Sequence, residues 1–311
     1  MNISNLIELT RATVLNEGSI SSVSSFALSL KELNKACAFF SNDELEIQLA
    51  LQKGAFVIIS ENDVKITDKD VFFLKVDEIK LAVLRILRFI SEEKGLNFIL
   101  CSKMELNLCP AFSLNYLYGD IFLDFQTIMK AKNDSFIYCD DELYLLKLCA
   151  SYEVLRQATY KMIEQGSVFF TSLLCEGLYF KNLHFPFILA QNFANIASKL
   201  IQNKQEVIFK AAYLNFFKIF FIDDDFNLCK FGTSNKALIV VFNELDFEFF
   251  KEGFKCVSGF KSALKNSLFC DFSYSKIEDL KYLDFRYCLL MQDLDELLEC
   301  LVQNKTQEAL F

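Results

Sequence analysis

The spacing of apolar residues in the first eighty positions predicts alternating strands and helices. Apolar runs at 36–40, 56–59 and 71–76 have the length of buried strands, and the run at 43–53 between the first two is amphipathic. Gly54 follows that run at the point where a helix end takes a positive φ. The pattern therefore predicts a strand, a helix, a second strand and a third.

Two amphipathic runs indicate which helix faces are buried. In the first, Leu45 and Leu49 share one side, so we expect that side to lie on the sheet. Ile47 and Ala50 flank it. The second run begins after Asp77, its expected cap. The apolar stripe of this second helix consists of Ile79, Ala82, Val83, Ile86, Leu87 and Ile90.

The alternation continues to the end of the chain. A helix at 4–15 and a strand at 19–30 precede the first apolar run. Strands that alternate with helices predict parallel βαβ units joined by right-handed crossovers. Further strands are expected at 96–101, 135–139, 167–174, 178–180, 207–212, 216–222, 237–242, 255–257 and 287–291, and further helices at 140–155, 186–201, 246–251, 259–265 and 293–302.

The length of 311 residues allows two or three domains, each with its own core. We expect an α/β domain over residues 1–94 and a central α/β domain over 95–235. A small α/β unit follows over 236–311. The fold class is therefore α/β, with a shortened Rossmann-like region after the first domain.

Composition and charge exclude some partners. The composition is globular, with 53% hydrophobic residues, and 32 basic against 41 acidic residues leave a net charge of −9. A grip on nucleic-acid phosphates requires clustered Lys and Arg, so no nucleic-acid partner is expected. We attribute the 35 Phe and the absence of Trp to codon bias rather than to an aromatic recognition surface.

Cysteine usage and hydropathy indicate a reducing, aqueous environment. The 11 Cys form no C-x-x-C pair and lie mostly in apolar runs, and His184 is the single histidine. We expect reduced core thiols, no metal site and no cofactor. The apolar windows fall short of the roughly 20 residues of a membrane span, and the start of the chain lacks a signal-peptide pattern. A cytoplasmic protein without a membrane span is expected.

Residues 1 to about 110 resemble the amino-terminal part of the Mur ligases, most of all those that add D-alanyl-D-alanine to a UDP-muramoyl peptide. The matching segments are Ser24-Ser25, Cys37-Ala38-Phe39, the helix and turn from Ala50 through Gly54-Ala55 to Ile59, and Val76-Asp77 through Ala82-Val83. The resemblance implies a domain that binds a UDP-sugar precursor, then an ATPase domain and a third domain. It implies that Ser24, Ser25, Ser102 and Lys103 are ligand-binding positions.

Two family motifs are altered in this sequence. The Asp-Ser/Thr-Arg signature after the early strand is replaced around Phe26-Ala27-Leu28, without an acid or an Arg. The Gly-rich loop with Gly-Lys-Ser/Thr is replaced by residues 101–109, which contain no glycine and add Glu105. Side chains there keep the backbone away from a phosphate, and Glu105 is expected to repel one. We expect no bound nucleotide and no catalytic residue.

Other candidate sites have simpler structural interpretations. His184 is a candidate general base, and structural placement is the alternative. Asp140-Asp141 and Asp223 to Asp225 are candidate Mg²⁺ ligands, with helix capping and turn formation as alternatives. Residues 232–235 fit a turn rather than a phosphate loop. The Phe-rich run at 247–250 fits a core position or a protein interface.

The sequence supports a leading functional hypothesis and two alternatives. The first is a non-catalytic Mur-ligase-like binding or interaction module with an unknown protein partner, linked to peptidoglycan or cell-envelope assembly. The second is an active ATP-dependent ligase, or another enzyme with an atypical nucleotide site around Lys103, Asp140 and Asp223. The third is a protein scaffold that binds no small molecule.

Overall fold

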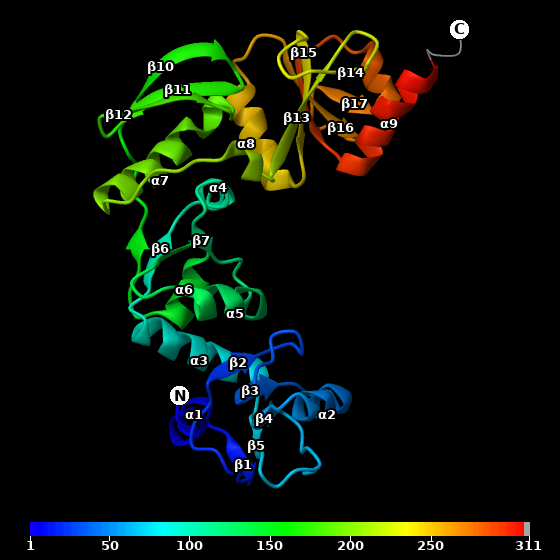
Figure 1. Ribbon diagram of the computed structural model, residues 1–311. Coiled ribbons are helices and arrows are strands. Elements are labelled where there is room, and N and C mark those ends of the chain that lie inside the picture. Colours follow the sequence, from blue (N-terminus) through cyan, green and yellow to red (C-terminus); the bar gives the residue numbers. More distant parts are fainter. Residues whose placement is uncertain (308–311) are drawn as a thin grey trace. The chain divides into compact units, whose positions relative to one another are not determined.

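The computed structural model describes residues 1–307 and, except at 164–166 and 302–307, their side chains. It contains two compact units, coloured from blue to green and from green to red in Figure 1. The first comprises residues 1–109 and 114–155, and the second comprises 110–113 and the chain from 156 onward. The expected boundaries after residues 94 and 235 fall inside these units, so the three-domain division stays a prediction.

The first sheet of the first unit has the strand order β1-β5-β4-β3-β2, with β1 antiparallel to β5 and the other pairs parallel. The predicted order of strand, helix and two strands over 36–76 is confirmed, and Gly54 has a φ of 89°. The elements are α1 (Ile3–Thr10), β1 (Thr13–Asn16), β2 (Ser25–Ala27), β3 (Cys37–Phe40), α2 (Glu44–Gln52), β4 (Val57–Ser60), β5 (Phe72–Lys75) and α3 (Ile79–Glu93).

Two predictions at the start of the chain are wrong. The first helix ends at Thr10 because Arg11 takes a left-handed conformation, with a φ of 56°. Residues 13–16 then pair with the edge of the sheet at β5 instead of continuing the helix. The strand expected over 19–30 shrinks to β2, since only Ser25–Ala27 pair with β3.

The buried face of α2 also differs from the prediction. Ile47 and Ala50 are buried, whereas Leu45 and Leu49 are 70% and 46% exposed. Asp43 accepts hydrogen bonds from the amides of Leu45 and Glu46, which fixes where the helix begins. The side with the small Ala50 then faces the sheet, and the two leucines point outward.

The helix α3 buries the predicted stripe against both sheets of the first unit. Ile79, Ala82, Val83, Ile86, Leu87 and Ile90 are all buried in one cluster with α1, α5 and α6. The expected cap is wrong, because the amide of Ile79 donates to Glu61 Oε1 at 2.7 Å rather than to Asp77. The cap of α3 is thus Glu61, a residue of the β4–β5 connection that is distant from the helix in sequence.

The second sheet of this unit is parallel, in the order β7-β8-β6-β9. The strands predicted at 96–101 and 135–139 are confirmed as β6 and β8. The helix expected over 140–155 is shorter, because Cys149 is already extended, and α5 was not predicted. The elements are β6 (Asn97–Leu100), α4 (Lys103–Leu108), β7 (Asn115–Tyr116), α5 (Ile121–Lys130), β8 (Phe136–Cys139), α6 (Glu142–Leu148) and β9 (Glu153–Val154).

The second unit begins with an antiparallel sheet, β10-β11-β12, on which α7 packs. Pro186 precedes a short 3₁₀ turn that leads into α7, so the helix predicted from Pro186 is confirmed. The strand expected at 207–212 is wrong, because a 3₁₀ turn (η2) forms at Ala211–Tyr213. The elements are β10 (Tyr160–Ser167), β11 (Phe170–Cys175), β12 (Leu178–Leu183), η1 (Phe187–Leu189) and α7 (Ala190–Gln202).

The six-stranded sheet of this unit has the order β14-β13-β15-β18-β16-β17. The strands β15, β18, β16 and β17 are parallel, whereas β13 is antiparallel to both of its neighbours. The helix α8 follows β15 along the chain, and the helix α9 follows β18. The elements are β13 (Phe217–Ile222), β14 (Leu228–Cys229), β15 (Lys236–Val241), α8 (Glu244–Phe254), β16 (Phe260–Lys265), β17 (Phe272–Tyr274), η3 (Ile277–Tyr282), β18 (Tyr287–Met291) and α9 (Leu294–Gln307).

Two predictions in this sheet are wrong. The strand expected at 255–257 does not form, and residues 260–265 are the strand β16 instead of a helix. The tertiary pairing of β16 with β18 overrides the helical pattern of the local sequence. Gly259 permits that pairing, because a Cβ there would lie 2.6 Å from the Cβ of Arg286.

The phenylalanine side chains serve mainly as core. Phe247 and Phe250 of the Phe-rich run are 2% and 0% exposed, so these two rings pack in the core. All 11 cysteines are free thiols, and most of them are buried. No helix within residues 1–307 is both long enough and apolar enough to cross a bilayer.

Candidate functional site

The segment after β6, where the sequence predicts a lost nucleotide loop, folds into the short helix α4. Ser102 is the cap of this helix, and its hydroxyl oxygen accepts from the amide of Glu105 at 3.4 Å. In return, the amide of Ser102 donates to Glu105 Oε2 at 2.7 Å. The two side chains form a capping box, so amides that would face a phosphate already have acceptors within the chain.

The expectation that Glu105 repels a ligand from outside needs correction. Glu105 is 5% exposed, and its carboxylate turns back onto the start of its own helix. The reason is the three-residue spacing from Ser102, which is the spacing of a capping box. The negative charge therefore occupies the helix start instead of projecting from it.

Lys103 and Asp140 lie at the carboxyl ends of β6 and β8. Lys103 Nζ is 3.3 Å from Asp140 Oδ2, and the lysine side chain is 49% exposed. Burial raises the pKa of the neighbouring Cys101 and Cys109 thiols, which favours their protonated form. At this edge of the sheet, Asp140 thus pairs with the charge of Lys103, and the capping box of Ser102 and Glu105 occupies the start of α4.

Ser24 lies directly before the early strand β2, and Ser25 is the first residue of that strand. The Ser24 hydroxyl lies 3.1 Å from the carbonyl of Lys35 and 3.2 Å from that of Ala36. The Ser25 hydroxyl is buried in β2, opposite Cys37 of β3. Binding of a UDP sugar by Ser24 and Ser25 stays a prediction.

The remaining candidates make contacts within the chain. His184 is exposed, and its ring stacks edge-on against Phe170. Asp223 belongs to the second unit and accepts from the amides of Asp225 and Asn227, as a turn-forming aspartate does. Asp141 caps α6. In the part of the chain that is described, no three His, Cys, Asp or Glu side chains gather into a metal-binding group.

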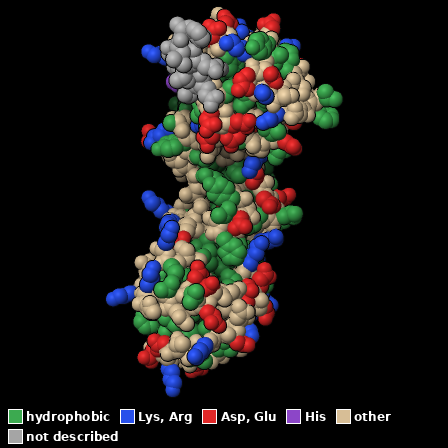
Figure 2. All heavy atoms as spheres, turned by 90° about the vertical axis from the view of Figure 1, so that its right-hand side faces the viewer, with side chains coloured by type: hydrophobic (Ala, Val, Ile, Leu, Met, Phe, Trp, Pro, Cys, Tyr) green, Lys and Arg blue, Asp and Glu red, His purple; other side chains and the backbone are tan. Residues whose placement is uncertain are grey.

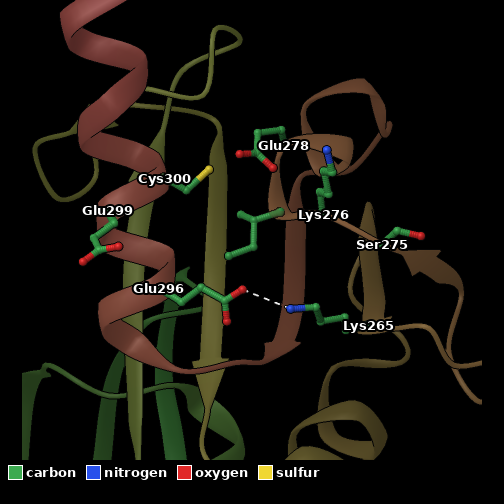
Figure 3. Close-up of a pocket in the computed structure, with 8 residues that line it drawn as sticks. Lys265, Ser275, Lys276, Glu278, Glu296, Glu299 and Cys300 are labelled. Atoms are coloured by element: carbon green, nitrogen blue, oxygen red, sulfur yellow. Dashed lines mark hydrogen bonds and ion pairs between the residues drawn. The ribbon is translucent and has the colours of Figure 1, made fainter.

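A feature that the sequence did not reveal lies at the carboxyl ends of the parallel strands in the second unit. We call it the acidic cavity, a space of about 380 Å³ between α9 and η3. In Figure 3 the Cys300 sulfur and the carboxylates of Glu278 and Glu296 turn toward this space. The Nζ atom of Lys265 lies 3.0 Å from Glu296 Oε1. Lys276 and Glu299 complete its charged lining.

A second cavity adjoins the first at Lys265, which lines both. We call it the apolar cavity, and its volume is about 410 Å³. It lies at the carboxyl edge of the parallel strands, beside α8, where ligands commonly bind in open α/β sheets. Its walls include Glu244, Phe247, Glu248, Leu264, Phe269 and Met291.

Sequence reasoning missed these cavities because it assigned residues 259–265 to a helix. A strand there would have placed Lys265 at a carboxyl edge, next to the residues after 241 and 291. The alternation that marks a half-buried strand is weak in this segment, since Ser262 and Ala263 are both buried.

Comparison with solved structures shows that the chain has a Mur ligase-like fold. It is similar to the MurF ligase from Thermotoga maritima, seen in complex with ADP, with 12% identity and a TM-score of 0.56 over 91% of this chain and 98% of that one. It is also similar to the UDP-N-acetylmuramoylalanyl-D-glutamyl-2,6-diaminopimelate--D-alanyl-D-alanyl ligase from Acinetobacter baumannii, with 9% identity and a TM-score of 0.51 over 98% of both chains.

These comparisons confirm the α/β class and the resemblance to Mur ligases at the level of fold. No family model matches the sequence, and no curated protein matches it. At identities of about a tenth, shared fold does not carry activity from one chain to another.

Proposed function

We propose that this chain is a non-catalytic Mur-ligase-like protein that works as a binding or interaction module, linked to peptidoglycan or cell-envelope assembly. The observation that carries the proposal is the capping box at the start of α4. It places the Glu105 carboxylate on the amide of Ser102, in the position where a phosphate-binding loop presents bare amides. The link to the cell envelope rests on the fold.

The charges around this point support the proposal. A triphosphate approaching α4 would meet the partly exposed Asp140 and would find the helix start already occupied by the Glu105 carboxylate. Lys103 is the nearby cation, and it already pairs with Asp140. Binding would require breaking that pair as well as displacing Glu105 from the helix start, and both changes oppose association.

The proposal predicts that Mg-ATP does not bind. Isothermal titration of the full chain with Mg-ATP up to millimolar concentration is expected to give only the heat of dilution, because the Ser102 and Glu105 amides at the start of α4 already have acceptors within the chain. An active Mur ligase titrated in the same buffer provides the positive control.

If the titration does show heat of binding, a matched variant tests whether the binding site is at α4. Micromolar binding by the wild-type chain that disappears in Lys103→Ala would place a nucleotide at α4 and would refute the proposal. The same chain mixed with UDP-muramoyl peptide, D-alanyl-D-alanine and Mg-ATP is expected to release no inorganic phosphate above the rate without protein.

A further inference from the structure

Two large apolar side chains stand exposed beside the apolar cavity. Leu268 and Phe269 are 91% and 82% exposed on the connection between β16 and β17. The backbone there is nevertheless held in place, since Lys251 Nζ donates to the carbonyl of Phe269 at 2.9 Å and the Phe269 amide donates to Ser267 Oγ at 3.2 Å. Apolar side chains that a fixed loop presents to water, next to an apolar cavity, are typical of a site of association.

The cavity behind Phe269 continues the apolar surface inward. Phe247 is 2% exposed and forms part of the wall, together with Leu264 and Met291. Leu245, at the start of α8, is a further exposed apolar residue, at 71%. A volume of about 410 Å³ accommodates one or two large side chains, and this is the size of an anchor in a short peptide segment.

The charges around the opening are predominantly negative. Glu244 is exposed and makes no ion pair among the described residues, whereas Glu248 pairs with Lys251 at 3.6 Å. Lys265 is held by Glu296. The adjoining acidic cavity brings three glutamates against two lysines. In Figure 2, which faces the side where α9 lies in Figure 1, acidic side chains gather on the upper part of the surface.

We propose that the apolar cavity, with Phe269 at its rim and Glu244 at its mouth, docks a short protein segment in which a large apolar side chain stands next to Lys or Arg. The apolar side chain enters beside Phe247 and Phe269, and the basic side chain faces Glu244. The excess of carboxylates selects a basic rather than an acidic partner. This inference rests on the proposed function and specifies the partner class of the interaction module.

Selection from a random peptide library on the immobilised full chain tests the docking site. We expect enriched peptides to share an apolar residue adjacent to Lys or Arg. A fluorescein-labelled copy of the most enriched peptide is then titrated in an anisotropy assay. Phe269→Ser and Glu244→Lys are each expected to weaken its binding at least tenfold, and Glu244→Lys should regain binding to the peptide with Glu in place of its basic residues.

Tyr282→Ser is the matched control, because Tyr282 is 84% exposed in the same unit and does not line the cavity. Its affinity is expected to equal that of the wild type. Circular dichroism verifies that every variant is folded. Failure to enrich any peptide, enrichment without the basic–apolar pattern, or binding unchanged in Phe269→Ser would overturn the docking site. Those results would not affect the proposed function, which the Mg-ATP titration tests separately. Binding of Mg-ATP would instead refute the proposed function.

Discussion

Replacing Phe193 by alanine is expected to lower the free energy of unfolding of the second unit by about 4 kcal/mol. Phe193 lies on α7, is 0% exposed and contacts four other phenylalanine rings, with centroids 5.1 to 5.3 Å away. Alanine removes the ring that the others surround and leaves a cavity that they cannot all move to fill. The four rings belong to Phe112, Phe180, Phe185 and Phe209.

Hydrogen exchange measured by mass spectrometry checks this prediction unit by unit. Peptides from α7 and β11 should exchange faster in Phe193→Ala, because local opening follows the lost stability. Peptides from α3, in the other unit, should keep their rates. Phe242→Ala is the control, since Phe242 is 42% exposed, and its effect is expected to stay within about 0.5 kcal/mol. Unchanged protection of α7 in Phe193→Ala would contradict the assigned core.

The sequence pattern predicts those parts of the fold in which local periodicity and tertiary packing agree. The stripe of α3 and the strands β3, β4, β6 and β8 are examples, because each is apolar on the faces it buries. Prediction failed where pairing with a distant strand decided the conformation. Residues 13–16 became a strand through β5, and residues 260–265 became one through β18. No local pattern carries that information.

The candidate site was predictable in its chemistry but not in its geometry. The missing glycines after Cys101 can be read from the sequence alone, and the loss of phosphate binding that they suggest stays a prediction. The role of Glu105 could be assigned only from the structure. A carboxylate that projects outward would repel a ligand, whereas this carboxylate accepts from the Ser102 amide and caps its own helix. The cavities at Lys265 required the strand assignment of β16, which the local pattern had concealed.

Replacing Asp124 by alanine is expected to lower the free energy of unfolding of the first unit by about 3 kcal/mol. Asp124 is 0% exposed on α5, and its two carboxylate oxygens accept from the amides of Tyr118 at 2.7 Å and Gly119 at 3.0 Å. Alanine leaves both amides without these acceptors and frees the β7–α5 loop, which the carboxylate holds over the first turn of α5.

Burial raises the pKa of Asp124, whereas its hydrogen bonds to the Tyr118 and Gly119 amides act in the opposite direction. Because the folded pKa lies above the unfolded one, the contribution of this ionisation to stability is fully present below the unfolded pKa and declines as the pH rises through the folded pKa. Between the unfolded and the folded pKa of Asp124, the free energy of unfolding of the wild type is therefore expected to fall as the pH rises. The decrease should be smaller in Asp124→Ala, which lacks this carboxyl. Urea unfolding at pH 4 and pH 7 measures the free energy of unfolding of the wild type and of Asp124→Ala. Hydrogen exchange of the β7–α5 peptides, in separate experiments at the same two pH values, measures the protection of the loop. A variant with unchanged loop protection at both pH values would show that the carboxylate does not hold this loop.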